Sequence, residues 1–108
     1  MIFMEILKTI SSAGTVDVLV SLGKGPRRFT DVMFETKLNP GILNRVLKGL
    51  LKAGVIKRCD SGLGYDLTEK GMKVSLYAFR IIEESGTSGP EDKEMIETLT
   101  KRLEAIHA

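Results

Sequence analysis

The strongest hydrophobic periodicity in the chain lies between Asn39 and Gly54, where apolar residues recur at the i, i+3, i+4, i+7 and i+8 spacing of one helix face. This spacing predicts an amphipathic helix over 40–53. Asn39 is suited to cap the first turn, Pro40 suits the first helical position, and Gly54 can adopt the left-handed conformation that ends a helix. The predicted buried positions are Leu43, Val46, Leu47, Leu50 and Leu51.

The opposite face of this predicted helix is basic and rich in hydrogen-bonding groups, without a carboxylate. It carries Gly41, Asn44, Arg45, Lys48 and Lys52. In a DNA major groove Arg can pair with guanine and Asn with adenine, and Ile42 can meet a thymine methyl group. The pattern therefore favours a helix that reads DNA, with Asn39 at its start as a further candidate contact, and the alternative is an ordinary solvated basic face.

The same kinds of pattern predict the other elements. Apolar stripes predict helices over 2–10, 16–22, 31–37, 69–85 and 91–108, and apolar–polar alternation predicts a hairpin with strands 55–59 and 63–67. Thr15 and Thr30 are the expected N-caps of the second and third helices. Val16, Leu19, Val20 and Leu22 are expected in the core. This order of elements predicts a mainly α protein with a small β-hairpin (α+β), the winged helix-turn-helix fold, with additional N- and C-terminal helices.

The last two predicted helices carry more apolar surface than one small core can cover. The helix over 69–85 is apolar on more than one side, and the last helix has apolar residues at 3-4-3 spacing, as in the seam of a coiled coil. We therefore expect a homodimer; the alternative is that the last helix folds back on its own domain. The expected division is a DNA-binding domain over 1–85, a turn over 86–90 and a dimerisation helix over 91–108. The expected dimer residues are Leu76, Phe79, Ile96, Leu99, Leu103 and Ile106.

Composition restricts the class of protein. With 108 residues, 43% hydrophobic and 28% charged, the chain is expected to be a soluble globular protein. Its apolar runs span only a few residues and its start lacks a basic segment, so neither a membrane span nor a signal peptide is expected. One cysteine, Cys59, and one histidine, His107, cannot supply a metal site within one chain, which argues against an enzyme and against a bound cofactor. A single cysteine also fits the reducing cytoplasm.

Charge is distributed unevenly along the chain. Residues 24–58 hold nine Lys and Arg but only Asp31 and Glu35 as acids, a net charge of +7, whereas the rest of the chain has a net charge of −5. A basic middle on an otherwise acidic body is the electrostatic pattern of a protein that binds a polyanion. Double-stranded DNA is therefore the expected partner.

Three segments resemble HxlR-type bacterial and archaeal regulators. Residues 25–32, Gly-Pro-Arg-Arg-Phe-Thr-Asp-Val, are similar to that family's GPxRFxEL segment. Residues 47–58 are similar to its LK-x-L pattern followed by Gly, two hydrophobic residues and Arg, and residues 65–71 to its Y-x-LT-x-x-G segment; the MarR, ArsR and PadR groups share these last two. The resemblance covers residues 15–82. It implies a homodimeric, prokaryotic-type transcriptional regulator whose third core helix reads the major groove.

The entry to the predicted third helix is a second candidate DNA contact. It carries Arg27, Arg28 and Thr30. Cationic side chains beside a helix N-terminus suit a phosphate group. The alternative is that Arg28 pairs with Asp31 or Glu35 within the chain.

The hairpin, or wing, over 57–64 is a third candidate. Lys57, Arg58 and Ser61 can lie along the DNA backbone or the minor groove. A wing this short cannot reach far, and the alternative is that Arg58 pairs with an acid of its own chain.

Together these features predict a sequence-specific DNA-binding regulator of transcription that acts as a homodimer. The alternative is a winged-helix module for protein–protein contact in a larger transcription or chromatin assembly. The acid-free outer face over 40–53 favours DNA. A cleft between the long helices of a dimer would be the place for a small apolar effector near Tyr77 or Phe79, although plain core packing explains these side chains more simply.

Overall fold

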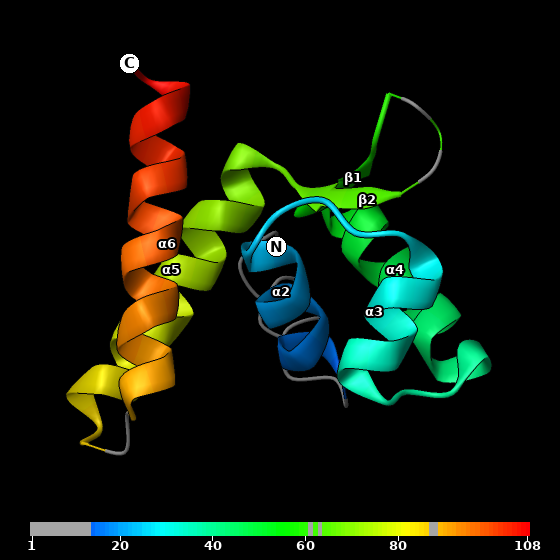
Figure 1. The fold of residues 1–108 in the computed structure, drawn as a ribbon, viewed down its shortest axis with the longest axis horizontal. Helices are drawn as coiled ribbons and strands as arrows, with labels where there is room; N and C mark the ends of the chain where they lie inside the picture. Colours follow the sequence, from blue (N-terminus) through cyan, green and yellow to red (C-terminus); the bar gives the residue numbers. More distant parts are fainter. Residues whose placement is uncertain (1–13, 61, 63, 87–88) are drawn as a thin grey trace.

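The computed structural model describes residues 14–60, 62, 64–86 and 89–108. In chain order its elements are α2 (Thr15–Gly23), α3 (Phe29–Thr36), α4 (Pro40–Ala53), β1 (Ile56–Arg58), β2 (Tyr65–Leu67), α5 (Glu69–Glu84) and α6 (Pro90–Ile106) (Figure 1). The helix expected over 2–10 lies outside the described residues, as does Ser61. No helix within them is long and apolar enough to cross a membrane. The described residues are mainly helical with one antiparallel hairpin, which confirms the predicted fold class.

The amphipathic helix α4 has the bounds that the sequence predicted. Its first helical residue is Pro40, and the side-chain oxygen of Asn39 accepts a hydrogen bond from the Ile42 N–H at 2.8 Å. Gly54 ends the helix in the left-handed conformation, with φ of 75°. Because both ends are determined by residues next to the helix, local sequence was sufficient to locate it.

Helices α2 and α3 begin earlier than expected, and neither predicted threonine cap forms. The N-cap of α2 is Gly14, at φ 84°, and Thr15 is already helical and only 1% exposed. The N-cap of α3 is Arg28, so Thr30 lies inside the first turn, exposed to solvent. The left-handed Gly14 starts α2 without a side-chain cap, and a Cβ at this glycine would meet the side chain of Leu38 at 2.8 Å.

This start places different residues of α2 in the core. Val16 is 44% exposed, so its predicted core role is wrong, and Val20 is only partly buried. Val18, which the sequence did not single out, is fully buried, together with Leu19 and Leu22. The buried face of the helix is therefore shifted by one residue from the expected one.

The hairpin is shorter than expected and has an additional neighbour. β1 and β2 are antiparallel, with Arg58 opposite Tyr65 and Lys57 opposite Asp66. Arg27 adds a bridge on the other edge of β2: its N–H donates to the Tyr65 carbonyl at 3.0 Å, and the Tyr65 N–H donates to the Arg27 carbonyl at 2.8 Å. The entry to α3 and the wing are therefore one connected unit.

Helix α5 begins in very close contact with the chain that precedes β1. Thr68 caps it by accepting a hydrogen bond from the Gly71 N–H at 3.0 Å, and a Cβ at Gly71 would lie 1.8 Å from the Val55 carbonyl oxygen. Only glycine permits this approach. The direction in which α5 leaves the hairpin therefore depends on Gly71.

Helix α6 folds back along α5 within the same chain and also contacts α2. Leu99 is fully buried there, and Met95 is 6% exposed. In Figure 1 the α5–α6 pair lies on one side of the molecule and α3, α4 and the hairpin on the other, with α2 between them. Helix α6 therefore packs on its own domain, and its role as a dimerisation helix stays a prediction.

Candidate nucleic-acid interface

The outer face of α4 is an exposed strip of polar and basic groups. Its members are Gly41, Asn44, Arg45, Lys48 and Lys52, all exposed to solvent. The opposite face, with Leu43, Leu47 and Leu50 each at most 1% exposed, holds the helix in the core. Among the described residues, none offers a hydrogen bond or an ion pair to the side chains of Asn44, Arg45 or Lys48. These groups are therefore available to another molecule.

The first turn of α4 offers fewer free polar groups for a DNA contact than the sequence alone suggested. The side-chain oxygen of Asn39 is used as the helix cap, so this residue orients the helix rather than standing free. Ile42 is 37% exposed. A Cβ at Gly41 would meet only the Asn39 side-chain oxygen, at 3.5 Å, which is an ordinary contact. The fold thus leaves room for a larger residue at 41, and only close approach of a partner would require glycine.

The two arginines before α3 have different surroundings. Arg27 is tied to its own chain: its Nε pairs with Glu35 Oε1 at 3.1 Å, and its Nη1 donates to the Pro26 carbonyl at 3.1 Å. Arg28 is exposed and has no such partner among the described residues. The pairing with Glu35 that was considered for Arg28 is therefore made by Arg27, and Arg28 is the free cation.

Glu35 balances the charge at this entry. Its Oε2 accepts a hydrogen bond from the buried Ser21 hydroxyl of α2. The hydrogen bond from Ser21 is the main reason that the pKa of Glu35 lies below its usual value. Partial burial raises this pKa, whereas the hydrogen bond from Arg27 and the positive charge of Arg27 lower it further. The ionised carboxylate therefore links α2, α3 and the segment before α3.

The wing presents Lys57 and Arg58 to solvent. The Arg58 guanidinium lies over the Tyr65 ring, 5.3 Å from its centroid, and donates to the Tyr65 hydroxyl at 3.2 Å. Within the described residues Arg58 pairs with no carboxylate, so its charge is not neutralised. The third wing candidate, Ser61, lies outside the described residues.

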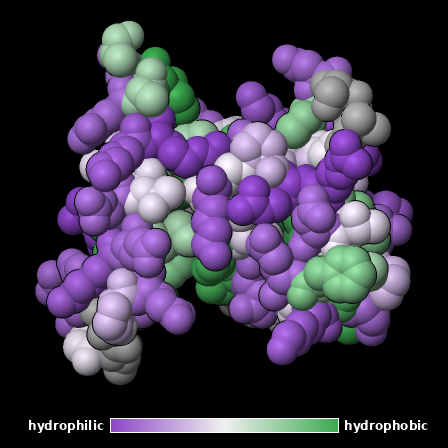
Figure 2. Space-filling model, viewed as in Figure 1, coloured by the Kyte–Doolittle hydropathy of each residue, from purple (hydrophilic) through white to green (hydrophobic). Residues whose placement is uncertain are grey.

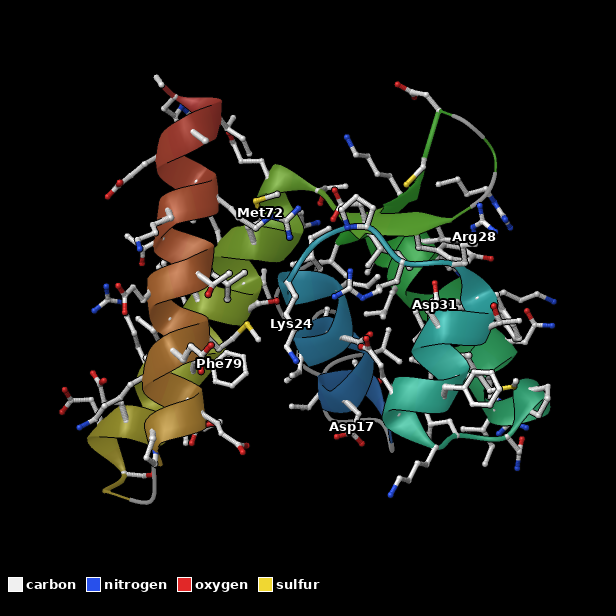
Figure 3. All side chains as sticks on the ribbon, in the orientation of Figure 1. Asp17, Lys24, Arg28, Asp31, Met72 and Phe79 are labelled. Carbon is white, nitrogen blue, oxygen red and sulfur yellow. The ribbon has the colours of Figure 1, made fainter. Side chains whose placement is uncertain are left out.

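The entry to α3 and the wing share one cavity. An open cavity of about 290 Å³ is lined by Arg28, Thr30, Arg58 and Tyr65, among others. Figure 3 shows Arg28 at the start of α3 beside the hairpin, and Phe79 on the other side of the molecule at the α5–α6 pair. Two groups of candidates that are distant in sequence are thus brought together in a second basic site.

Tyr65 is a member of this site that the sequence analysis missed. Its ring supports the Arg58 guanidinium, and its backbone forms the bridge to Arg27. The observed register places Tyr65 directly opposite Arg58, and cross-strand partners lie side by side on one face of a hairpin. The predicted strands 55–59 and 63–67 would have placed residue 64 there, so the sequence did not indicate this pair.

The residues expected between two chains are placed mostly within one. Leu76 is 9% exposed, Phe79 is 5% exposed and Leu99 is fully buried. Ile96 and Leu103 are partly buried against the same core. Ile106 is 48% exposed. Tyr77, beside the expected effector position, is 59% exposed. Figure 2 shows that the surface in this view is mostly hydrophilic, with hydrophobic residues in separate patches.

The fold and the basic strip agree with the comparison to known families. The sequence model described as winged helix-turn-helix matches residues 15–85. The chain belongs to this family. No curated protein and no solved structure matches the chain.

In the winged helix-turn-helix domain, a DNA-binding fold, α3 and α4 form the helix–turn–helix and β1–β2 is the wing. Helix α6 begins at Pro90 and so lies beyond the residues that the family match covers. What α6 adds to the domain must be derived from its contacts.

Proposed function

We propose that this winged helix-turn-helix protein is a sequence-specific regulator of transcription that binds double-stranded DNA as a homodimer. Helix α4 enters the major groove, and the wing over 57–64 lies along the backbone or the minor groove. One observation carries the proposal above the others: the outer face of α4 presents Asn44, Arg45 and Lys48 without a carboxylate and without partners within the described chain.

The proposed DNA-contacting residues divide into two roles. Arg45 and Asn44 have the side chains that discriminate between bases, and Ile42 and Gly41 near the start of α4 would approach the bases closely. Lys48, Arg28, Thr30, Lys57 and Arg58 contact phosphates, which position the protein without selecting sequence. Arg27 and Asn39 support these contacts from within, since their polar groups are already engaged.

The homodimer is proposed from the surface that the fold leaves uncovered. Tyr77 and Ile81 are 59% and 70% exposed on α5, four residues apart and therefore on one face of the helix. Lys73 precedes them and Glu84 follows them on the same face. An antiparallel α5–α5 pair across a two-fold axis would bring Lys73 near Glu84 of the other copy and cover both apolar residues.

A dimer of this kind determines the form of the target site. Dimeric readers place their recognition helices about 34 Å apart, one turn of B-DNA, so a palindromic operator is expected. The resemblance of residues 25–32, 47–58 and 65–71 to HxlR-type regulators supports a regulator of that type. An apolar effector would bind beside Tyr77, where the two copies meet.

The first experiment is fluorescence anisotropy with a random duplex over a salt series, together with light scattering for mass. Binding whose logarithmic salt slope corresponds to several neutralised phosphates, at about 0.9 per phosphate, is expected together with a dimeric mass. Lys93→Ala is the control variant, because it removes an exposed cation of α6, the helix on the other side of the molecule from α4 (Figure 1).

The outcomes separate the two functions considered. Selection of a palindromic sequence from a random pool would then define the operator. Absence of binding even at low salt would contradict the proposal and favour the protein-contact module, with the strip on α4 as the place to look for an acidic partner.

A further inference from the structure

Arg102 of α6 lies outside the family match, yet it joins three elements of the molecule. Its Nη1 donates to the carbonyl oxygens of Leu22 at 2.9 Å and Gly23 at 3.1 Å, at the end of α2. Its Nη2 contacts the Asp66 carboxylate in β2 at 2.8 Å. These side chains are only 20% and 16% exposed, so removing one charge would leave the other poorly solvated and without its partner.

Asp66 occupies the middle of the wing strand. Side chains alternate along a strand, so Asp66 points to the opposite side from Tyr65 and Leu67. Leu67 is buried in the core, and Tyr65 carries the Arg58 guanidinium. The strand that supports Arg58 is therefore held to the core on one side and to α6 on the other.

We propose that Arg102 is a positioning residue for the wing: α6 fixes β2 and thereby sets, through Tyr65, where Arg58 meets DNA. This inference rests on the proposed DNA binding. An arginine is required because its planar fork can serve the two carbonyls and the carboxylate at the same time, whereas a lysine cannot span all three. Helix α6 is then a working part of the DNA-binding unit, although it lies beyond the family match.

The test compares two variants of α6, each of which replaces one positively charged side chain with a neutral one. Arg102→Gln removes the three-way contact. Lys101→Gln removes a cation whose side chain is 73% exposed and which, among the described residues, pairs only with Glu97. Both variants change the net charge equally. In anisotropy titrations at a temperature where circular dichroism shows both to be folded, Arg102→Gln should bind about 2- to 30-fold more weakly than Lys101→Gln. Equal affinities would overturn the proposal.

A double-variant cycle separates positioning of the wing from a general loss of structure. The effect of Arg102→Gln should largely disappear in an Arg58→Ala background and persist in an Arg45→Ala background, because α4 contacts DNA separately. The same loss in both backgrounds would overturn the proposal. The DNA affinity of Arg102→Lys should lie between those of wild type and Arg102→Gln. Asp66→Asn, which removes the charge of the partner, should show the same dependence on the two backgrounds as Arg102→Gln.

A measurement without DNA keeps this inference distinct from the proposed function. The amides of Arg27, Cys59 and Tyr65 are hydrogen-bonded within the wing unit, and Arg102→Gln should accelerate their hydrogen exchange more than that of the α4 amides. If the wild type binds no DNA, the proposed function fails, and this exchange pattern still shows whether Arg102 holds the wing. Unchanged exchange of these three amides would overturn that role.

Discussion

Helices α4 and α6 both begin with proline at the first helical position and both bury leucine on one face, but their polar residues have different partners. In α4 the groups of Asn44, Arg45 and Lys48 are exposed and unpaired among the described residues. In α6 the guanidinium of Arg102 is largely buried and contacts α2 and β2. The same amphipathic design thus serves an outward surface in one helix and internal cohesion in the other.

The comparison also separates the effects of charge. Helix α4 has no acid, whereas α6 begins with Glu91 and Asp92, where the positive end of the helix dipole favours them. A positive strip on one side of a molecule and acidic residues on the other would orient the protein towards a polyanion. Substitution of a buried apolar residue of α6, such as Leu99, should therefore change stability, whereas substitutions on the outer face of α4 should change binding.

The largest effect is expected from Leu99→Ala in α6. Leu99 is fully buried within one chain, so its truncation should lower the free energy of unfolding by about 2–5 kcal/mol. Urea unfolding at two protein concentrations is the measurement, with Ile106→Ala, at a half-exposed position, as the control. A loss of stability that appears only at the higher concentration would mean that Leu99 packs between chains, and the contrast between the helices would fail.

An intermediate effect is expected from Arg45→Ala and Asn44→Ala in α4. Each should weaken binding to the selected operator by about 1–3 kcal/mol while leaving the midpoint of thermal unfolding nearly unchanged, because neither side chain has a partner in the free protein. Titration with operator and random duplexes measures the binding, and thermal unfolding of the free variants measures the midpoint. Equal losses on the two duplexes would show that these residues contact only phosphates.

The smallest effect concerns the link between α2 and α3. The folded-state pKa of Glu35 lies below its ordinary value of 4.5, so the ionised carboxylate stabilises the fold above that pH, and the contribution is lost as the pH falls through the lowered pKa. Glu35→Gln should therefore show a smaller loss of stability than wild type between about pH 5 and pH 3. Urea midpoints across this range, with Glu97→Gln on α6 as the control, test it. A Glu35→Gln profile parallel to wild type would contradict it.

Much of the fold follows from neighbours in the sequence. The bounds of α4 were predictable because Asn39 and Gly54 lie next to it, and Thr68 likewise marks the start of α5. The caps of α2 and α3 were not predictable in this way, because Thr15 is drawn into the core and Arg28 is held by the bridge of Arg27 to Tyr65. Side-chain chemistry suggested a cap at both threonines, and tertiary packing determined the actual start.

The candidate site likewise has one part that the sequence predicts and one part that it does not. The basic strip on α4 was predictable, since periodicity alone separates its buried and exposed faces. The choice between Arg27 and Arg28 was not, because it depends on Glu35 and on the position of β2.

The winged helix-turn-helix order of elements and the solvent-facing side of α4 could be predicted from the sequence, because both follow from residue spacing and from caps within a few positions. The packing of α6 on its own domain and the contact of Arg102 with the carbonyl of Leu22, 80 residues earlier, became visible only in the folded chain. A contact over that separation depends on how the helices are arranged in space, and hydrophobic spacing along α6 fits a partner in either chain equally well.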